Sequence, residues 1–263
     1  MRALVLDFDG VIADSSRETF AVARRTYLEL RPESPLADRS ADDVYRDFLA
    51  AMPLGNRAED YAVVLGAIER NADLADQAAY DRLHAAEEAT WLARYHERYY
   101  RVRADLARED LANWLGLVPP YRFFVELLRG RAGERVYAMA TSRDRRSVDA
   151  LLAHYGIADL FPADRILDKE AGARKTAHLT ELRERLGLPF PDLTFVDDKV
   201  NHLDATAPLG VRCALAAWGY NGARERDQAR ERGYLLCTEA DAEPLLFGPS
   251  DRWHNRALER SRS

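Results

Sequence analysis

Two aspartates, Asp7 and Asp9, stand one residue apart at the end of an apolar run near the start of the chain, where residues 3–10 read ALVLDFDG. A continuous apolar run of this kind is typical of a strand that is buried on both faces of a parallel sheet. Two carboxylates at the end of such a strand oppose each other's ionisation, and a bound divalent cation reverses that penalty. The spacing therefore indicates a metal site or a shared proton. An aspartate-rich turn after the strand is the alternative.

Other predicted strands also end in polar residues. The strand over 135–140 is followed by two hydroxyls, the strand over 193–196 is followed by a second pair of acids, and a lysine opens a helix between them. These residues are Thr141 and Ser142, Asp197 and Asp198, and Lys175. A cation is unfavourable at a helix start, and hydroxyls with free backbone amides before a helix can hold an anionic oxygen. Because sites in open parallel sheets lie beyond the carboxyl ends of the strands, we expect these side chains to meet Asp7 and Asp9.

The chemistry of this set is that of magnesium and phosphate. Carboxylate oxygens are hard ligands, and Mg²⁺ is commonly held by one or two carboxylates together with substrate phosphate. The same residues make an incomplete Ser-His-Asp site and a poor zinc site. The set therefore predicts a site for a divalent cation and a phosphorylated ligand.

The elements that must position these residues are of two kinds. From Ser15 to about Leu115 the chain is predicted to be helical, and Ser15 with Glu18 has the form of a capping box that begins the first helix. Pro119 and Pro120 end this region, and short strands alternate with helices after them. The alternation predicts a parallel sheet with helices on both faces. The N-terminal strand then belongs to the C-terminal sheet, and the helical region is an insert between them.

The predicted elements have approximate bounds. Helices of the insert are expected over 21–30, 41–52, 58–71 and 80–115, the last as one or two helices. Strands after the insert are expected over 135–140, 165–167, 193–196, 211–216 and 234–237.

Composition excludes several classes of protein. The chain has 263 residues, of which 47% are hydrophobic and 31% charged, so it is globular rather than disordered. No apolar run approaches the roughly 18 residues of a membrane helix, and the start reads as a strand rather than a signal peptide, so we expect a cytoplasmic protein that binds no membrane. The net charge of −6 disfavours a general nucleic-acid binder. Cys213 and Cys237 are too few for a disulfide framework or a zinc quartet and are predicted to be core residues.

The motifs resemble those of the haloacid dehalogenase superfamily, in its phosphatase and phosphomutase branch. The matching residues, in order, are Asp7-Phe8-Asp9-Gly10-Val11-Ile12-Ala13-Asp14-Ser15, Thr141, Lys175 and Asp197-Asp198. The resemblance is to phosphoglycolate phosphatase-like and beta-phosphoglucomutase-like members with a helical cap. It implies an α/β fold with a Rossmann-like parallel sheet core over 1–15 and 117–248 and an inserted all-helical cap over 16–116. The residues themselves predict a flexible tail over 249–263. The insert is longer than common versions of that cap.

The resemblance also implies catalytic and phosphate-binding roles. Asp7 would be the nucleophile that takes the phosphoryl group as an aspartyl-phosphate, and Asp9 would protonate the leaving oxygen and then activate water. Thr141 and Lys175 would bind the phosphoryl oxygens, and Ser142 is a further candidate phosphate-binding residue in the same turn.

A magnesium site is implied by the same resemblance. Asp7, the backbone carbonyl of Asp9, and Asp198 would hold Mg²⁺, and Asp197 would support the ion through a bound water. The metal and the lysine would together offset the repulsion between a carboxylate and a phosphate dianion.

The chain departs from the family pattern at two places. Lys169 competes with Lys175 for the lysine motif, and we favour Lys175 because it lies at a helix start. Asn201 stands where the family often has asparagine, but His202 stands where it often has a further aspartate, so one acid that orients the metal is missing.

Two neighbouring residues are interpreted structurally. Asp14 is predicted to be a hydrogen-bonding residue at the hinge of the cap rather than a catalytic acid. Arg143 is predicted to stabilise the turn after the 135–140 strand through its backbone. A contact of its side chain with phosphate is the alternative.

The function favoured by these motifs is a magnesium-dependent phosphomonoester hydrolase that acts on a small phosphorylated metabolite as a monomer or homodimer. A phosphomutase shares all the residues named, and a non-catalytic binding protein on the same fold is a further alternative. Asp9 argues against a dehalogenase, because a leaving halide needs no acid.

Overall fold

A computed structural model describes all residues except 1, 56, 173 and 249–263. The tail predicted over 249–263 therefore lies outside the described residues. The chain divides into two compact units, one made of residues 1–14 and 120–263 and the other of residues 15–119.

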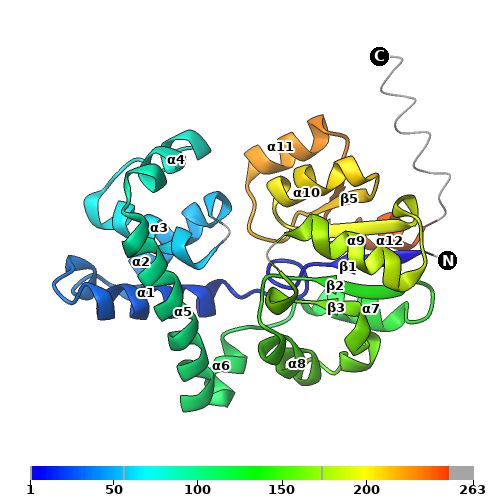
Figure 1. Cartoon of the computed structure of the whole chain (residues 1–263), viewed down its shortest axis with the longest axis horizontal. Coiled ribbons are helices and arrows are strands. Elements are labelled where there is room, and N and C mark those ends of the chain that lie inside the picture. Colours follow the sequence, from blue (N-terminus) through cyan, green and yellow to red (C-terminus); the bar gives the residue numbers. More distant parts are fainter. Residues whose placement is uncertain (1, 56, 173, 249–263) are drawn as a thin grey trace. The chain divides into compact units, whose positions relative to one another are not determined.

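The first unit is built on a six-stranded sheet in the order β3-β2-β1-β4-β5-β6 (Figure 1). Its strands are β1 (Ala3–Leu6), β2 (Val136–Ala140), β3 (Ile166–Leu167), β4 (Leu193–Asp197), β5 (Arg212–Ala216) and β6 (Leu235–Cys237). Every strand pair is parallel, which confirms the predicted sheet class. The central strand β1 is apolar throughout because both of its faces are covered.

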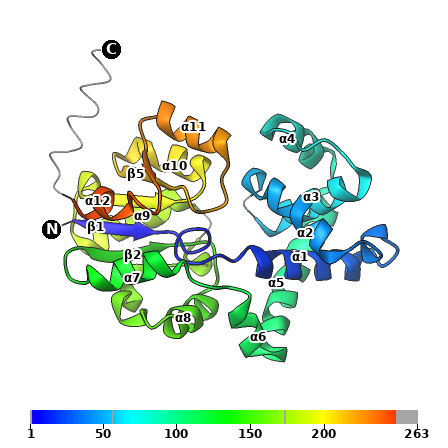
Figure 2. The same cartoon turned by 180° about the vertical axis from the view of Figure 1, so that it is seen from behind.

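Helices cover both faces of this sheet (Figure 2). They are α7 (Arg122–Gly130), α8 (Arg145–His154), α9 (Lys175–Leu186), α10 (Val200–Thr206), α11 (Ala223–Glu231) and α12 (Ala242–Phe247). On one face, side chains from α9, α10 and α11 form a buried cluster with alternate strand residues. On the other face, the hydroxyl of Tyr137 in β2 donates to the carbonyl of Leu128 in α7 (3.0 Å).

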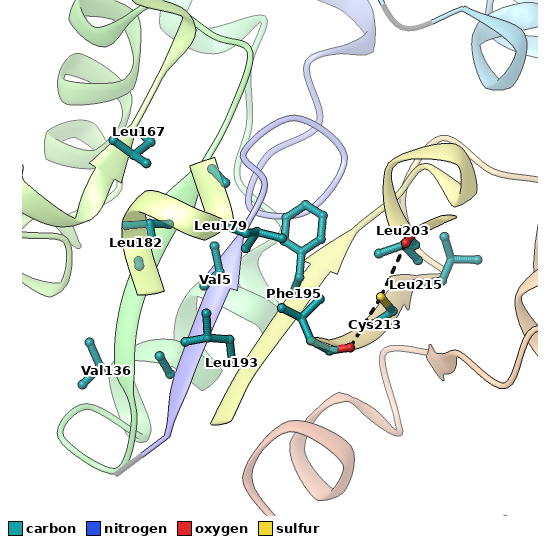
Figure 3. Close-up of a cluster of buried hydrophobic side chains, with 14 of the residues drawn as sticks. Val5, Val136, Leu167, Leu179, Leu182, Leu193, Phe195, Leu203, Cys213 and Leu215 are labelled. Atoms are coloured by element: carbon teal, nitrogen blue, oxygen red, sulfur yellow. Dashed lines mark hydrogen bonds between the residues drawn. The ribbon is translucent and has the colours of Figure 1, made fainter. Parts of the chain in front are cut away.

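Figure 3 shows the first of these clusters, in which Val5, Phe195 and Leu215 from three strands pack beside Leu179 and Leu203 from two helices. Burying one such side chain contributes about 1.5–3 kcal/mol. The Cys213 thiol is part of the cluster and donates to the Leu203 carbonyl (3.6 Å), and Cys237 is also buried, so both cysteines are core residues as predicted. This packing fixes the strands that carry the candidate site.

The second unit is helical, as predicted. Its helices are α1 (Ser16–Leu30), α2 (Ala41–Ala51), α3 (Ala58–Arg70), α4 (Gln77–Ala86), α5 (Ala89–Glu109) and α6 (Leu111–Gly116). The Tyr95 hydroxyl of α5 donates to the Ala23 carbonyl of α1 (2.9 Å), which ties these two helices together. None of the helices in the described part of the chain is both long and apolar enough to cross a membrane.

The predicted capping box at Ser15 and Glu18 is wrong. The Ser15 side chain makes no capping hydrogen bond to α1. Glu18 is fully buried, and its carboxylate lies 2.9 Å from Arg103 Nε and accepts from Trp114 Nε1 (3.2 Å). A buried carboxylate needs charged or hydrogen-bonding partners, so tertiary packing decides where this side chain points.

Candidate active site

Asp7 and Asp197 meet at the carboxyl ends of two neighbouring strands. Asp7 directly follows β1, Asp197 ends β4, and the Asp7 amide donates to the Val196 carbonyl (2.9 Å). The strand order reverses here, because the chain goes from β1 to β2 and β3 on one side and then crosses to β4 on the other. Such a switch point is the usual place for a ligand in an open parallel sheet.

Lys175 brings a positive charge between these two aspartates. Its Nζ lies 2.9 Å from Asp7 Oδ2 and 3.5 Å from Asp197 Oδ2, and it donates to the Ala140 carbonyl (2.6 Å). The side chain is only 3% exposed, so the lysine is held by its partners rather than by water. Lys169 instead belongs to the short turn after β3, where its amide bonds to the Arg143 carbonyl (3.1 Å). Lys175 is thus the lysine that reaches Asp7.

The buried charges shift each other's pKa. Burial raises the pKa of Asp7 to about 6, although the adjacent Lys175 acts to lower it. For Lys175, burial acts to lower the pKa, but Asp7 and Asp197 outweigh it, so the pKa is raised and the ammonium stays charged. For Asp197, burial acts to raise the pKa, but His202 and Lys175 outweigh it, so the pKa is lowered.

The two acids of β4 have different surroundings. Asp197 Oδ1 accepts from the Lys199 amide (2.9 Å), and His202 Nδ1 lies 3.0 Å from Asp197 Oδ2. Asp198 Oδ2 accepts from the amide of Tyr220 (2.9 Å). Burial raises the pKa of Asp198 to about 7, with Lys199 opposing the rise. Asp197 is therefore held as an anion, whereas Lys199 only partly offsets the burial of Asp198.

A loop after β5, residues 217–221, also contacts the segment that contains Asp7 and Asp9. The sequence analysis did not predict these contacts. Trp218 Nε1 donates to the Val11 carbonyl (3.0 Å), and the Tyr220 hydroxyl donates to Asp14 Oδ1 (3.2 Å). Asp14 thus has the hydrogen-bonding role predicted for it. Gly219 packs so tightly that an added Cβ would lie 2.4 Å from the Asp198 Cβ and 2.4 Å from the Gly10 carbonyl oxygen.

Replacing Gly219 with alanine is expected to displace Asp198 and to lower the stability of the fold. Overpacking of this kind typically costs about 1–3 kcal/mol, measurable as a lower thermal midpoint. Gly222→Ala is the matched control, since among the described residues a Cβ there meets just the end of one flexible side chain, Glu225 Oε2 at 3.3 Å. Equal effects of the two substitutions would contradict the assignment of Gly219 as the support of Asp198.

The turn after β2 brings the predicted hydroxyls and Arg143 beside the first motif. Thr141 is fully buried, and its Oγ1 accepts from the Arg143 amide (3.1 Å), whereas Ser142 is exposed. The Arg143 guanidinium pairs with Asp9, with Nη2 2.8 Å from Oδ1. This contact was not predicted, because the interpretation of Arg143 rested on its backbone.

The buried acids fit a hard divalent cation. One ligand atom from each of Asp7, Asp197 and His202 lies within 4.8 Å of the others. Asp198 is outside this group but adjoins it in sequence. Burial makes it costly for a carboxylate to carry its negative charge, which is why burial raises the pKa. A bound cation offsets that cost. The carboxylate oxygens of Asp7 and Asp197 suit Mg²⁺, whereas His202 offers a ring nitrogen, which Mg²⁺ does not prefer.

Comparison with known proteins shows the family to which the chain belongs. The family model of haloacid dehalogenase-like hydrolases matches residues 1–210. The chain belongs to this family. A predicted phosphoglycolate phosphatase from Haemophilus somnus is 18% identical, with a TM-score of 0.64 over 94% of this chain and 98% of that one.

Two further solved structures share the fold. A candidate phosphoglycolate phosphatase from Lactobacillus delbrueckii subsp. bulgaricus is 16% identical, with a TM-score of 0.68 over 95% of this chain and 100% of that one. A haloacid dehalogenase-like hydrolase from Streptococcus pneumoniae is 14% identical, with a TM-score of 0.61 over 86% and 89%. No curated protein sequence matches the chain. The chain is thus a haloacid dehalogenase-like hydrolase whose substrate these similarities leave open.

Proposed function

We propose that this hydrolase is a magnesium-dependent phosphomonoester hydrolase that acts on a small phosphorylated metabolite through an aspartyl-phosphate. The observation that carries the proposal is the contact of Asp7 Oδ2 with Lys175 Nζ (2.9 Å) beside the acids of β4. A carboxylate that attacks a phosphate dianion meets like charge, so the site must supply positive charge. Lys175 supplies one charge. A divalent cation held by Asp7, Asp198 and the supporting Asp197 would supply the rest and neutralise charge on the phosphoryl group.

The reaction needs two displacements. An oxygen of Asp7 forms a bond to phosphorus while the bond to the leaving oxygen breaks, and Asp9 gives its proton to that oxygen. Water then attacks the phosphorus of the aspartyl-phosphate, Asp9 takes a proton from the water, and the bond between Asp7 and phosphorus breaks. Inorganic phosphate leaves and both aspartates return to their starting states. Thr141 and Lys175 orient the phosphoryl oxygens during both steps.

Asp9 favours a phosphatase over a dehalogenase within the family. A halide leaves as a stable anion, whereas an alkoxide leaves readily only when it is protonated. Asp9 lies two residues after Asp7, and its side chain is 30% exposed, so solvent and substrate both have access to it. A proton donor at this position assists the departure of an oxygen leaving group, whereas a halide leaving group does not need one.

The test is release of inorganic phosphate by the purified protein. The substrates are p-nitrophenyl phosphate and a panel of phosphorylated metabolites, including phosphoglycolate because two of the similar structures carry that name. We expect release with excess Mg²⁺ and none with a chelator. An isomerised sugar phosphate without release of phosphate would identify a phosphomutase. Inactivity across the whole panel would favour a non-catalytic protein.

A further inference from the structure

We propose that Arg143 is a positioning residue that sets the orientation of the Asp9 carboxyl group, which takes up a proton from solvent and then gives it to the leaving group. The inference rests on the proposed function, because it gives Asp9 the proton transfers described above. It adds a residue from the turn after β2 to the two aspartates that follow β1. Three observations carry it: the contact itself, the burial of the arginine, and the way in which the arginine is fixed.

The contact engages both oxygens of the Asp9 carboxylate. Arg143 Nε lies 3.1 Å from Oδ1 and 3.2 Å from Oδ2, and Nη2 lies 2.8 Å from Oδ1. A guanidinium that binds a carboxylate through two nitrogens sets the orientation of its plane as well as its position. A single hydrogen bond would leave that plane free to rotate.

Burial differs sharply between the two partners. The Arg143 side chain is 0% exposed, whereas that of Asp9 is 30% exposed. A fully buried arginine needs a partner for its charge, and the Asp9 carboxylate is such a partner. The Arg143 guanidinium is therefore the fixed, buried partner of this ion pair. The Asp9 carboxylate is the accessible partner, and it is the group that must reach the substrate.

Arg143 itself is held at both its backbone and its side chain. Its amide donates to Thr141 Oγ1 (3.1 Å), and its carbonyl accepts from the Lys169 amide (3.1 Å). Its guanidinium carbon lies 5.7 Å from the centre of the Phe8 ring, which in turn stacks on Tyr155 at 6.2 Å. The arginine is thus a rigid support for a carboxylate that lies two residues from the nucleophile.

The functional consequence depends on the leaving group. An alkoxide needs a proton as the bond to phosphorus breaks, whereas a nitrophenolate is stable without one. A misplaced Asp9 therefore slows the hydrolysis of an alkyl phosphate more than that of p-nitrophenyl phosphate. A purely structural role for Arg143, or a direct contact with the phosphoryl group, would slow both reactions equally.

The experiment compares kcat/KM for an alkyl phosphate and for p-nitrophenyl phosphate in wild type, Arg143→Met, Arg143→Lys and Asp9→Asn. We expect both Arg143 variants to lose at least about tenfold more activity on the alkyl phosphate, in the same sense as Asp9→Asn. Arg145→Met is the matched control, since Arg145 lies in the same segment but pairs with Asp149 (2.8 Å), and it should leave the ratio unchanged. If Arg143→Met fails to fold, Arg143→Lys carries the comparison, because it keeps the charge and loses the two-nitrogen contact.

A double variant, Arg143→Lys with Asp9→Asn, completes the test. If the arginine acts through Asp9, the double variant loses no more activity than Asp9→Asn alone. An equal loss on both substrates, or additive losses in the double variant, would overturn the inference while leaving the phosphatase proposal intact. Absence of hydrolysis by the wild type would overturn the phosphatase proposal, and this inference with it.

Discussion

Replacement of Asp7 with asparagine is expected to lower kcat for phosphate release by at least about 10³-fold, whichever phosphate ester is used. The carboxamide has nearly the shape of the carboxylate but is a far weaker nucleophile, so the aspartyl-phosphate cannot form. The loss should be equal for alkyl and aryl phosphates, because both react through the same attack of Asp7 on phosphorus. Steady-state phosphate release on both classes of ester measures it.

The fold should tolerate this substitution. Burial already disfavours the charged form of Asp7, raising its pKa to about 6, so a neutral side chain removes an electrostatic cost. We expect a thermal midpoint equal to or above that of the wild type. Asp168→Asn is a matched control: Asp168 is also buried and also follows a strand, β3, but its Oδ1 accepts from the Glu170 amide (2.9 Å). Full activity in Asp7→Asn would show that another group is the nucleophile.

The placement of Asp7, Thr141, Lys175 and Asp197 was predictable because it depends mainly on the backbone. Apolar runs identify the strands, and a parallel sheet brings their carboxyl ends to one edge. The register pairs Leu6 with both Met139 and Val196, so Asp7 and Asp197 lie at the same level and Thr141 lies one residue beyond it. The positions of these residues could therefore be predicted from the sequence, although Lys169 stayed an alternative to Lys175.

The side-chain contacts between distant segments were not predictable in the same way. The Arg143 guanidinium turns toward Asp9, and Tyr220 reaches Asp14, but nothing in the local pattern of either segment specifies those directions. Glu18 shows the same limit, since it satisfies the capping pattern by spacing and yet is drawn to Arg103. Local propensity is a weak guide wherever a buried charge must find a partner in another element.

Magnesium is expected to stabilise the protein much more at pH 8 than at pH 5. In the absence of metal, burial raises the pKa of Asp7 to about 6 and that of Asp198 to about 7, above their ordinary value of 3.8. A raised carboxyl pKa means that the folded state binds more protons than the unfolded state between these values. The stability of the metal-free protein therefore falls as the pH rises from about 4, up to about 6 for Asp7 and up to about 7 for Asp198, by up to about 1.4 kcal/mol per pH unit for each group. Asp197 does not contribute in this range, because its pKa is lowered and its effect lies at more acid pH.

A bound cation replaces those protons and removes the cost, so the metal competes with protons for the same carboxylates. Below the raised pKa values, the apparent dissociation constant for Mg²⁺ should rise about tenfold per pH unit for each proton displaced. Thermal midpoints with excess Mg²⁺ and with a chelator, measured from pH 5 to pH 8, give the stabilisation directly as a difference at each pH. Taking this difference cancels the titration of groups that face the site but do not respond to the metal.

Asp198→Asn provides the decisive comparison. It removes the carboxyl with the higher pKa while keeping an oxygen that can accept from the Tyr220 amide, so the metal-free variant should lose less stability toward pH 8 than the wild type does. It should also show a smaller shift with Mg²⁺, because a neutral amide oxygen is a weaker ligand than a carboxylate. A shift with Mg²⁺ that is the same at pH 5 and pH 8, or one that Asp198→Asn retains in full, would mean that the cation is held elsewhere. The raised pKa of Asp198 would then reflect the cost of burying its charge, and Mg²⁺ would not offset that cost.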